Sequence, residues 1–243
     1  MLIFNEAIST DETIPLAKAR LFQPPNPDAT PRSLFAHKAD DSELDHCCAS
    51  CREKLADVLW AYDDPLEILI YTDGSCIVPA GGSGNSSSRA GCAFVSGPEE
   101  YEGRCVKFRQ ELEGPTGSSY LQTSNRAELR AAIGALQYKR WQEDGWLTVV
   151  IATDSQYVVH GITDWIERWA AYGWRTGGRK PVKNRDLWEC LLAEVNELEK
   201  VGVAVAFWHI PRGLNHDADA GAKEAALTLE APAKFTRVCA ALE

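Results

Sequence analysis

Short apolar runs alternate with longer amphipathic segments over most of the chain. Residues 67–72 contain Ile-Leu-Ile-Tyr and residues 147–153 contain Val-Val-Ile-Ala, runs that are typical of strands buried on both faces. The pattern predicts five strands, at residues 67–72, 90–96, 106–112, 147–153 and 203–210. Helices are expected at residues 124–141, with Ser124 as cap, and at 155–160, 164–172, 184–200 and 217–229.

The order of these elements predicts the fold class. The first three strands follow one another directly, which favours an antiparallel meander, and the later strands alternate with helices. We therefore expect an α/β fold with a five-stranded mixed sheet, three antiparallel strands and then two parallel ones, flanked by helices. A Gly- and Ser-rich loop at residues 79–88 would join the first two strands, and it carries no P-loop signature.

Residues 1–65 lack this regular pattern. The run Pro24-Pro25-Asn26-Pro27 and the nearby Pro31 interrupt any regular element, and a short amphipathic helix is expected at residues 48–61. We expect three parts: an N-terminal extension at 1–65, partly irregular and partly packed on the main domain, a main domain at 66–230, and a C-terminal tail at 231–243.

The extension also contains a His-Cys-Cys-x-x-Cys cluster, formed by His46, Cys47, Cys48 and Cys51. The spacing of the last two cysteines suits zinc, but a second downstream pair is missing unless His37 contributes a ligand. Cysteines on a buried helix face are the simpler interpretation, so zinc stays an open alternative.

Composition limits the class of protein. The 243 residues are 45% hydrophobic and 25% charged, as in soluble globular proteins, and no apolar run approaches the ~20 residues of a membrane span. The first twenty residues lack a signal-peptide core, and Glu6, Asp11 and Glu12 argue against a mitochondrial presequence. Eight irregularly spaced cysteines indicate reduced thiols in an intracellular protein, nuclear or cytoplasmic rather than mitochondrial.

Charge is unevenly distributed along the chain. The formal net charge of −10 argues against a general nucleic-acid binder, because phosphate binding needs Lys and Arg. A local basic patch on an acidic protein can nevertheless hold a phosphate backbone. Six basic residues crowd into one short stretch: Arg168, Arg175, Arg179, Lys180, Lys183 and Arg185.

Four acidic residues are the strongest candidates for chemistry. Asp73 lies in Ile-Tyr-Thr-Asp-Gly-Ser, Glu128 in Ser-Asn-Arg-Ala-Glu-Leu, Asp154 in Ala-Thr-Asp-Ser-Gln-Tyr, and Asp219 in Asn-His-Asp-Ala-Asp. Taken singly, a turn, a helix first turn, a helix cap or a surface charge would explain each of them. Taken together, at strand ends and helix starts, they can converge on a hard divalent cation, since Mg²⁺ and Mn²⁺ prefer oxygen ligands.

In this order and with these flanking residues, the motifs resemble those of type 1 ribonuclease H, over about residues 67–229. The stretches Gly-Ile-Thr-x-Trp, Gly-Trp-Arg-Thr and Lys-Pro-Val-Lys-Asn-x-Asp-Leu-Trp also resemble the basic protrusion of that family, the handle, here at about 162–188. The resemblance implies a ribonuclease H-like fold and an endonuclease, expected to be a monomer, that hydrolyses the RNA strand of RNA/DNA hybrids to 5′-phosphate and 3′-hydroxyl products.

By the same resemblance, Asp73, Glu128, Asp154 and Asp219 would be the catalytic and metal-binding residues, holding two Mg²⁺ ions or Mn²⁺ as a substitute. Without metal these carboxylates would repel one another, so metal should stabilise the fold. The resemblance places nucleic-acid contacts at Gly74, Ser75, Cys76, Thr123, Asn125, Arg126, Gln156, Trp165, Arg179, Lys180, Lys183, Asn184, Arg212 and Asn215. A helix-start contact for Asn125, a surface amide for Gln156 and simple packing for Trp165 are the competing interpretations.

The chain departs from the commonest family pattern before Asp219. Residues 210–219 form a shorter segment than the loop that carries a turnover histidine in many members. His209 and His216 are candidate substitutes, or neither has the role, and Arg212 could hold the scissile phosphate or pair with a carboxylate. Alternatives to the hybrid nuclease are another nuclease or transferase on the same fold, a non-catalytic hybrid-binding protein, and a structural role in an assembly.

Overall fold

A computed structural model describes residues 19–36, 59–61, 66–78, 88–96 and 105–240 of the chain. The predicted zinc cluster and the predicted loop at 79–88, except for its last residue, lie outside these ranges. In the part of the chain that the structure describes, no helix is both long and apolar enough to cross a membrane.

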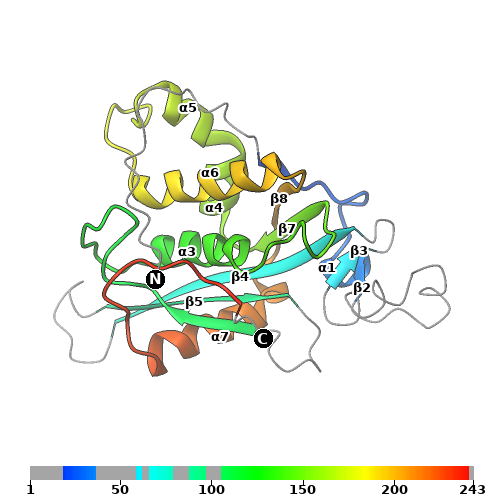
Figure 1. The fold of residues 1–243 in the computed structure, drawn as a ribbon, viewed down its shortest axis with the longest axis horizontal. Helices are drawn as coiled ribbons and strands as arrows, with labels where there is room; N and C mark the ends of the chain where they lie inside the picture. Colours follow the sequence, from blue (N-terminus) through cyan, green and yellow to red (C-terminus); the bar gives the residue numbers. More distant parts are fainter. Residues whose placement is uncertain (1–18, 37–58, 62–65, 79–87, 97–104, 241–243) are drawn as a thin grey trace.

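The predicted mixed sheet is confirmed (Figure 1). Strands β4 (Glu67–Ile77), β5 (Arg89–Val95) and β6 (Cys105–Arg109) are antiparallel neighbours. Strand β7 (Thr148–Thr153) pairs in parallel with β4, and β8 (Ala204–His209) pairs in parallel with β7. β4 is longer than predicted, because its second half, from Tyr71 to Ile77, pairs with β5. Asp73 therefore lies inside a strand and not in a turn.

The N-terminal extension adds three short strands to this sheet. β1 (Arg20–Leu21) pairs in parallel with β8, while β2 (Phe35–Ala36) follows the single-turn helix α1 (Pro31–Leu34) and pairs with β3 (Leu59–Ala61). β3 in turn pairs antiparallel with the start of β4. The helix predicted at 48–61 is thus wrong at its end, and its first part is not described. Strand β5 pairs with β4 only from Tyr71 onward, so the backbone groups of β4 before Tyr71 are not paired with β5 on that edge. Hydrogen bonds to these groups favour a strand at residues 59–61.

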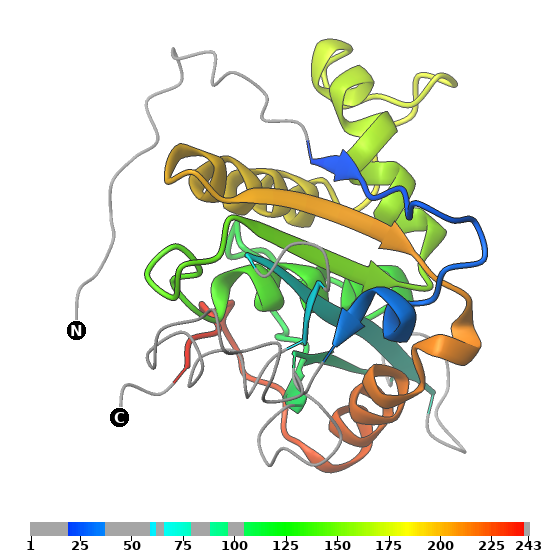
Figure 2. The same ribbon diagram turned by 90° about the vertical axis from the view of Figure 1, so that its right-hand side faces the viewer.

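Helices cover both faces of the sheet (Figures 1 and 2). α3 (Ser124–Gln137) and α6 (Arg185–Lys200) lie on one face, and α7 (His216–Thr228) lies on the other, against β4, β5 and β6. The main core lies between the sheet and the first pair of helices. Its largest fully buried side chains include Trp141, Trp188, Phe94 and Phe207.

Several helix boundaries differ from the predictions, and α3 ends at Gln137 and not at residue 141. Thr123, not Ser124, caps α3, because its extended backbone directs its hydroxyl to the Arg126 N–H. The segments predicted as separate helices form one continuous rod: α4 (Gln156–His160), a π-helical turn η3 (Gly161–Trp165) and α5 (Ile166–Ala171). A short 3-10 turn, η4 (Arg212–Leu214), precedes α7.

The C-terminal tail packs along the domain surface beside β6 and α3. The backbone N–H groups of Leu112 and Glu113 donate to the carbonyls of Pro232 and Ala233, and the Ala240 N–H donates to the Tyr138 carbonyl. Phe235 packs against the main core. Residues 232–240 are therefore fixed to the main domain by hydrogen bonds at both ends.

Candidate active site

The four carboxylates predicted to form one site lie together in the structure. Burial, together with repulsion from Asp154, Asp219 and Glu128, raises the pKa of Asp73 to about 7, although a hydrogen bond from the Gly74 N–H lowers it. Burial also raises the pKa of Glu128, with a smaller contribution from Asp154. Charges act on a carboxyl in this way only at short range, so the residues converge from four separate elements.

Sheet register places the first two of these side chains. Tyr71 on β4 lies opposite Ala152 on the parallel strand β7. Asp73 lies two residues after Tyr71, and Asp154 lies two residues after Ala152. Residues in register on neighbouring parallel strands lie side by side, and the two carboxylates consequently meet beside the end of β7. Asp73 is 8% exposed, which explains why burial dominates its pKa.

A glycine brings the helix α3 up to the strand β4. A Cβ on Gly74 would lie 2.1 Å from the backbone nitrogen of Glu128 and 2.2 Å from the carbonyl carbon of Ala127, so any other residue here would push the helix away. This close approach places Glu128 beside Asp73. Gly74, expected at the nucleic-acid surface, is buried and has a packing role.

Three of the carboxylates are oriented by neutral or cationic partners. The Asn215 amide Nδ2 donates to Asp154 Oδ1 and to the Thr72 carbonyl, at 3.0 Å each. The Ser155 hydroxyl donates to Glu128 Oε2. Asn215 is 1% exposed, so it positions Asp154 from inside the fold and does not contact nucleic acid from there.

Asp219 is engaged by two cations. Arg212 Nη2 lies 3.0 Å from Asp219 Oδ1, and Lys223 Nζ donates to Asp219 Oδ2 from one turn further along α7. Arg212 is thus paired with an active-site carboxylate, one of its two predicted roles. Lys223 was missed from the sequence, although its four-residue spacing from Asp219 is a recognisable helical ion-pair signal.

The donor set fits a hard divalent cation. All four groups are carboxylates, the ligands that Mg²⁺ and Mn²⁺ prefer, and their mutual repulsion is the feature that a cation would relieve. Among the residues that the structure describes, no three His, Cys, Asp or Glu side chains are drawn together into a ready-made metal cluster.

The two candidate turnover histidines lie at the same end of the sheet. His209 is the exposed last residue of β8, and His216 is the exposed first residue of α7, with its Nε2 3.4 Å from Asp217 Oδ1. The two positions do not distinguish which of these histidines would have the turnover role.

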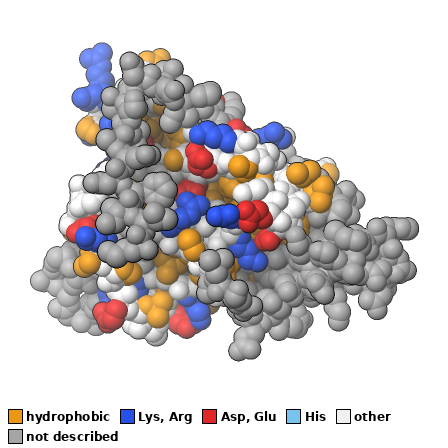
Figure 3. All heavy atoms as spheres, viewed as in Figure 1, with side chains coloured by type: hydrophobic (Ala, Val, Ile, Leu, Met, Phe, Trp, Pro, Cys, Tyr) orange, Lys and Arg blue, Asp and Glu red, His pale blue; other side chains and the backbone are white. Residues whose placement is uncertain are grey.

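The predicted handle projects from the face of the sheet that α3 and α6 cover (Figure 1). Arg179, Lys180 and Lys183 are exposed there, and Gln156 is exposed at the start of α4. Trp165 is half-buried and packs against the rings of His160, Tyr157 and Trp169. On the face shown in Figure 3, basic and acidic side chains are interspersed, so the net charge of −10 does not form a uniform acidic surface there.

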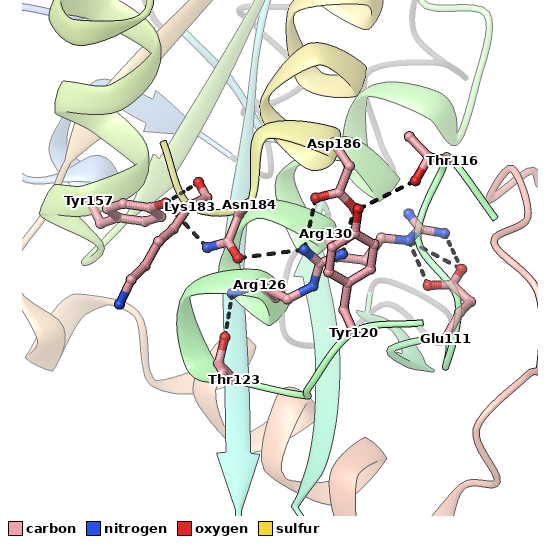
Figure 4. A network of polar contacts seen from close by, with 10 residues as sticks. All are labelled: Glu111, Thr116, Tyr120, Thr123, Arg126, Arg130, Tyr157, Lys183, Asn184 and Asp186. Atoms are coloured by element: carbon pink, nitrogen blue, oxygen red, sulfur yellow. Dashed lines mark hydrogen bonds and ion pairs between the residues drawn. The ribbon is translucent and has the colours of Figure 1, made fainter. Parts of the chain in front are cut away.

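The expected contacts near the start of α3 divide into exposed and buried residues. Thr123 and Asn125 are exposed, and Ser75 and Cys76 are half-buried. Arg126 is only 3% exposed and forms a two-pronged ion pair with Asp186, with N–O distances of 2.8 and 2.7 Å (Figure 4). Its charge is therefore compensated within the protein.

Comparison with known proteins gives a consistent result. The RNase H family model matches residues 65–227. A ribonuclease H of Pectobacterium carotovorum is 43% identical over 126 residues, which cover 51% of this chain and 68% of that protein. One from Treponema pallidum is 39% identical over 139 residues, covering 54% and 74%. Among solved structures, LC9-RNase H1, a type 1 RNase H with the type 2 active-site motif, is 27% identical with a TM-score of 0.45, covering 66% and 72%.

Proposed function

We propose that this protein is a metal-dependent endonuclease that acts on the RNA strand of RNA/DNA hybrids. The proposal proceeds from its family, because the chain belongs to the RNase H family and is a ribonuclease H. The observation that supports this proposal is the convergence of Glu128, Asp154 and Asp219 on the buried Asp73. Such a set of carboxylates is costly to maintain without a positive ligand.

The proposed reaction is hydrolysis of one phosphodiester bond. Water adds to phosphorus, the bond from phosphorus to the 3′ oxygen breaks, and that oxygen leaves as a 3′-hydroxyl while the phosphate stays on the 5′ side of the next nucleotide. Two Mg²⁺ ions, or Mn²⁺ in their place, would be held by Asp73, Glu128, Asp154 and Asp219 and would supply an activated water and compensation of the developing charge.

The residues around the carboxylates keep this site in order. Asn215 fixes the orientation of Asp154, and Ser155 fixes that of Glu128. Arg212 is 74% exposed at its side chain, so it can leave Asp219 and bind the scissile phosphate when substrate arrives. Selectivity for RNA would come from hydrogen bonds to the 2′-hydroxyl, made by the exposed amides of Asn125 and Gln156 and by the backbone of the half-buried Ser75 and Cys76.

The test is cleavage of end-labelled RNA/DNA, RNA/RNA and DNA/DNA duplexes with Mg²⁺ or Mn²⁺. We expect internal cuts in the RNA of the hybrid only, and a phosphate on the 5′ end of each new fragment. Asp73→Asn and Asp154→Asn should abolish cleavage and largely spare hybrid binding. Absence of cleavage by the wild-type protein with either metal would overturn the proposal, and retained hybrid binding in that case would favour a non-catalytic binding protein.

A further inference from the structure

Asn184 has an unusual conformation at the start of α6. It is the N-cap residue, yet its backbone is left-handed, with φ of 58° and ψ of 30°, and its side chain makes no cap hydrogen bond to the helix. An Asn at this position usually bonds the first turn of its own helix. Instead its Nδ2 donates to the Tyr157 hydroxyl at 3.2 Å and its Oδ1 accepts from Arg126 Nη1 at 3.5 Å (Figure 4).

The Tyr157 hydroxyl is the centre of this arrangement. It accepts hydrogen bonds from Asn184 Nδ2 and from Trp188 Nε1, the latter at 3.0 Å, and it donates to the carbonyl of Lys183 at 3.4 Å. Trp188 is fully buried and provides a rigid anchor for the hydroxyl. One oxygen atom on α4 therefore fixes two consecutive residues where the handle enters α6.

A buried ion pair holds the other side of Asn184. Arg126 and Asp186 are almost fully buried, and the Tyr120 ring lies 3.9 Å from the Arg126 guanidinium carbon. A Cβ on Gly114 would come within 2.3 Å of Asp186 Oδ2, so the turn preceding Tyr120 closes tightly over the pair. Arg126 thus serves to orient Asn184 and is not free to bind a phosphate.

The groups held in this way suit a phosphate. Asn184 Nδ2 has a second N–H beyond the one given to Tyr157, the exposed Lys183 carries an ammonium, and the Thr123 hydroxyl can donate its own proton while accepting from the Arg126 N–H. We propose that the Tyr157 hydroxyl is a positioning group that holds Asn184 and Lys183 against one backbone phosphate of the DNA strand. This inference rests on the proposed function and adds a residue to it.

The first experiment removes only the hydroxyl. Tyr157→Phe keeps the ring contacts with Trp165 and Trp188 and should raise KM for the hybrid roughly three- to tenfold, the effect of one lost hydrogen bond, with kcat nearly unchanged. Tyr138→Phe, whose ring packs on Phe94 away from the handle, is the matched control and should leave both constants unchanged. Thermal unfolding of each variant verifies that it is folded.

The second experiment tests whether Tyr157 acts through Asn184. Asn184→Gly removes the amide and tolerates the left-handed backbone, whereas Asn184→Ala would add strain. If the inference holds, Tyr157→Phe with Asn184→Gly should raise KM little more than Asn184→Gly alone. A scan of hybrids with one neutral methylphosphonate in the DNA strand should identify a position that weakens wild-type binding but affects Tyr157→Phe much less.

The outcomes separate this inference from the proposed function. Fully additive effects of the two substitutions, or equal methylphosphonate profiles for Tyr157→Phe and Tyr138→Phe, would overturn the positioning role while wild-type cleavage remains. Loss of the function itself would instead appear as absence of cleavage by the wild-type protein. A folded Tyr157→Phe variant with wild-type KM would likewise reject the inference.

Discussion

Asp73 is buried against three other carboxylates, and its ionisation should destabilise the metal-free fold. Its pKa is raised from 3.8 to about 7 by burial and by repulsion. The free energy of unfolding of the metal-free protein should therefore be highest below about pH 4, where Asp73 is neutral. This stability is lost as the pH rises through about 7, where Asp73 ionises in the folded protein. The same residue that would bind metal thus makes the metal-free protein less stable under neutral conditions.

Asp73→Asn should stabilise the protein in EDTA, and more so at pH 8 than at pH 5. The expected gain at pH 8 is on the order of 2 kcal/mol, or about 4–8 °C in Tm for a domain of this size. Thermal unfolding of both proteins at the two pH values measures it. Asp164→Asn, at an exposed ion pair on the handle side, is the control. A gain that is the same at both pH values would contradict the buried, repelled state of Asp73.

At the scale of elements, the handle and the C-terminal tail have different functions. The handle joins the rod of α4, η3 and α5 to α6 and exposes basic side chains. On the proposed function, these side chains would supply affinity for nucleic acid without sequence preference. The tail lies beside β6 and α3, and α3 carries Glu128. The first element should affect binding of substrate, and the second should affect stability of the domain.

Lys180→Ala combined with Lys183→Ala should weaken hybrid binding and reduce its dependence on salt. Each lost phosphate contact lowers the slope of log K against log salt by about 0.9 on a duplex, so a reduction of about 1–2 is expected. Fluorescence anisotropy at several salt concentrations measures the slope. Lys139→Ala with Lys200→Ala changes the net charge equally at exposed sites outside the handle, and an equal loss of slope in that pair would rule out a specific role for the handle.

Phe235→Ala should destabilise the whole domain by about 1–3 kcal/mol. Its ring lies 4.4 Å from the Arg130 guanidinium carbon, and Arg130 forms a buried ion pair with Glu111 at 2.7 Å. Without the ring, water would reach a charge pair that the tail now covers. Urea unfolding gives the change in free energy of unfolding, with the exposed Lys234→Ala as control. An unchanged midpoint would show that the tail contributes nothing to the domain.

On the scale of the whole molecule, four segments that are distant in sequence bring mutually repelling carboxylates together at one end of the sheet. Strands β4 and β7 bring Asp73 and Asp154 there, and α3 approaches over Gly74. The first turn of α7 adds Asp219, which is paired with Arg212 and Lys223. A ligand that binds only the assembled site stabilises the entire fold.

Mg²⁺ should therefore raise the Tm of the wild-type protein beyond the effect of NaCl at equal ionic strength. At a concentration one hundred times the Kd, the expected gain is about 2.7 kcal/mol. Replacement of both Asp73 and Asp154 by Asn should remove the Mg²⁺-specific part, and differential scanning calorimetry measures it without any substrate. An identical Mg²⁺ response in wild type and double variant would contradict the assignment of these residues to the metal.

The extent to which the sequence predicted the protein differs between its parts. The five core strands and the two flanking sets of helices follow from local patterns, because burial on both faces and helix periodicity leave clear signals in residue order. The four carboxylates were found instead through their motifs and the family resemblance that these motifs carry. The extension was predicted poorly, since residues 59–61 form a strand that is defined by its pairing with β4 and β2. A pairing partner several residues away is invisible to local propensity.

The sequence by itself determined the chemistry: which carboxylates are present, in which motifs, and on which kinds of element. The tertiary structure decided the role of each neighbour. It placed Asn215 and Arg126 in buried positioning contacts instead of at a nucleic-acid surface, paired Asp219 with Lys223, and turned Asn184 from its own helix toward Tyr157. Motifs record residue identity along the chain, whereas burial and hydrogen-bond partners depend on segments that meet only after folding.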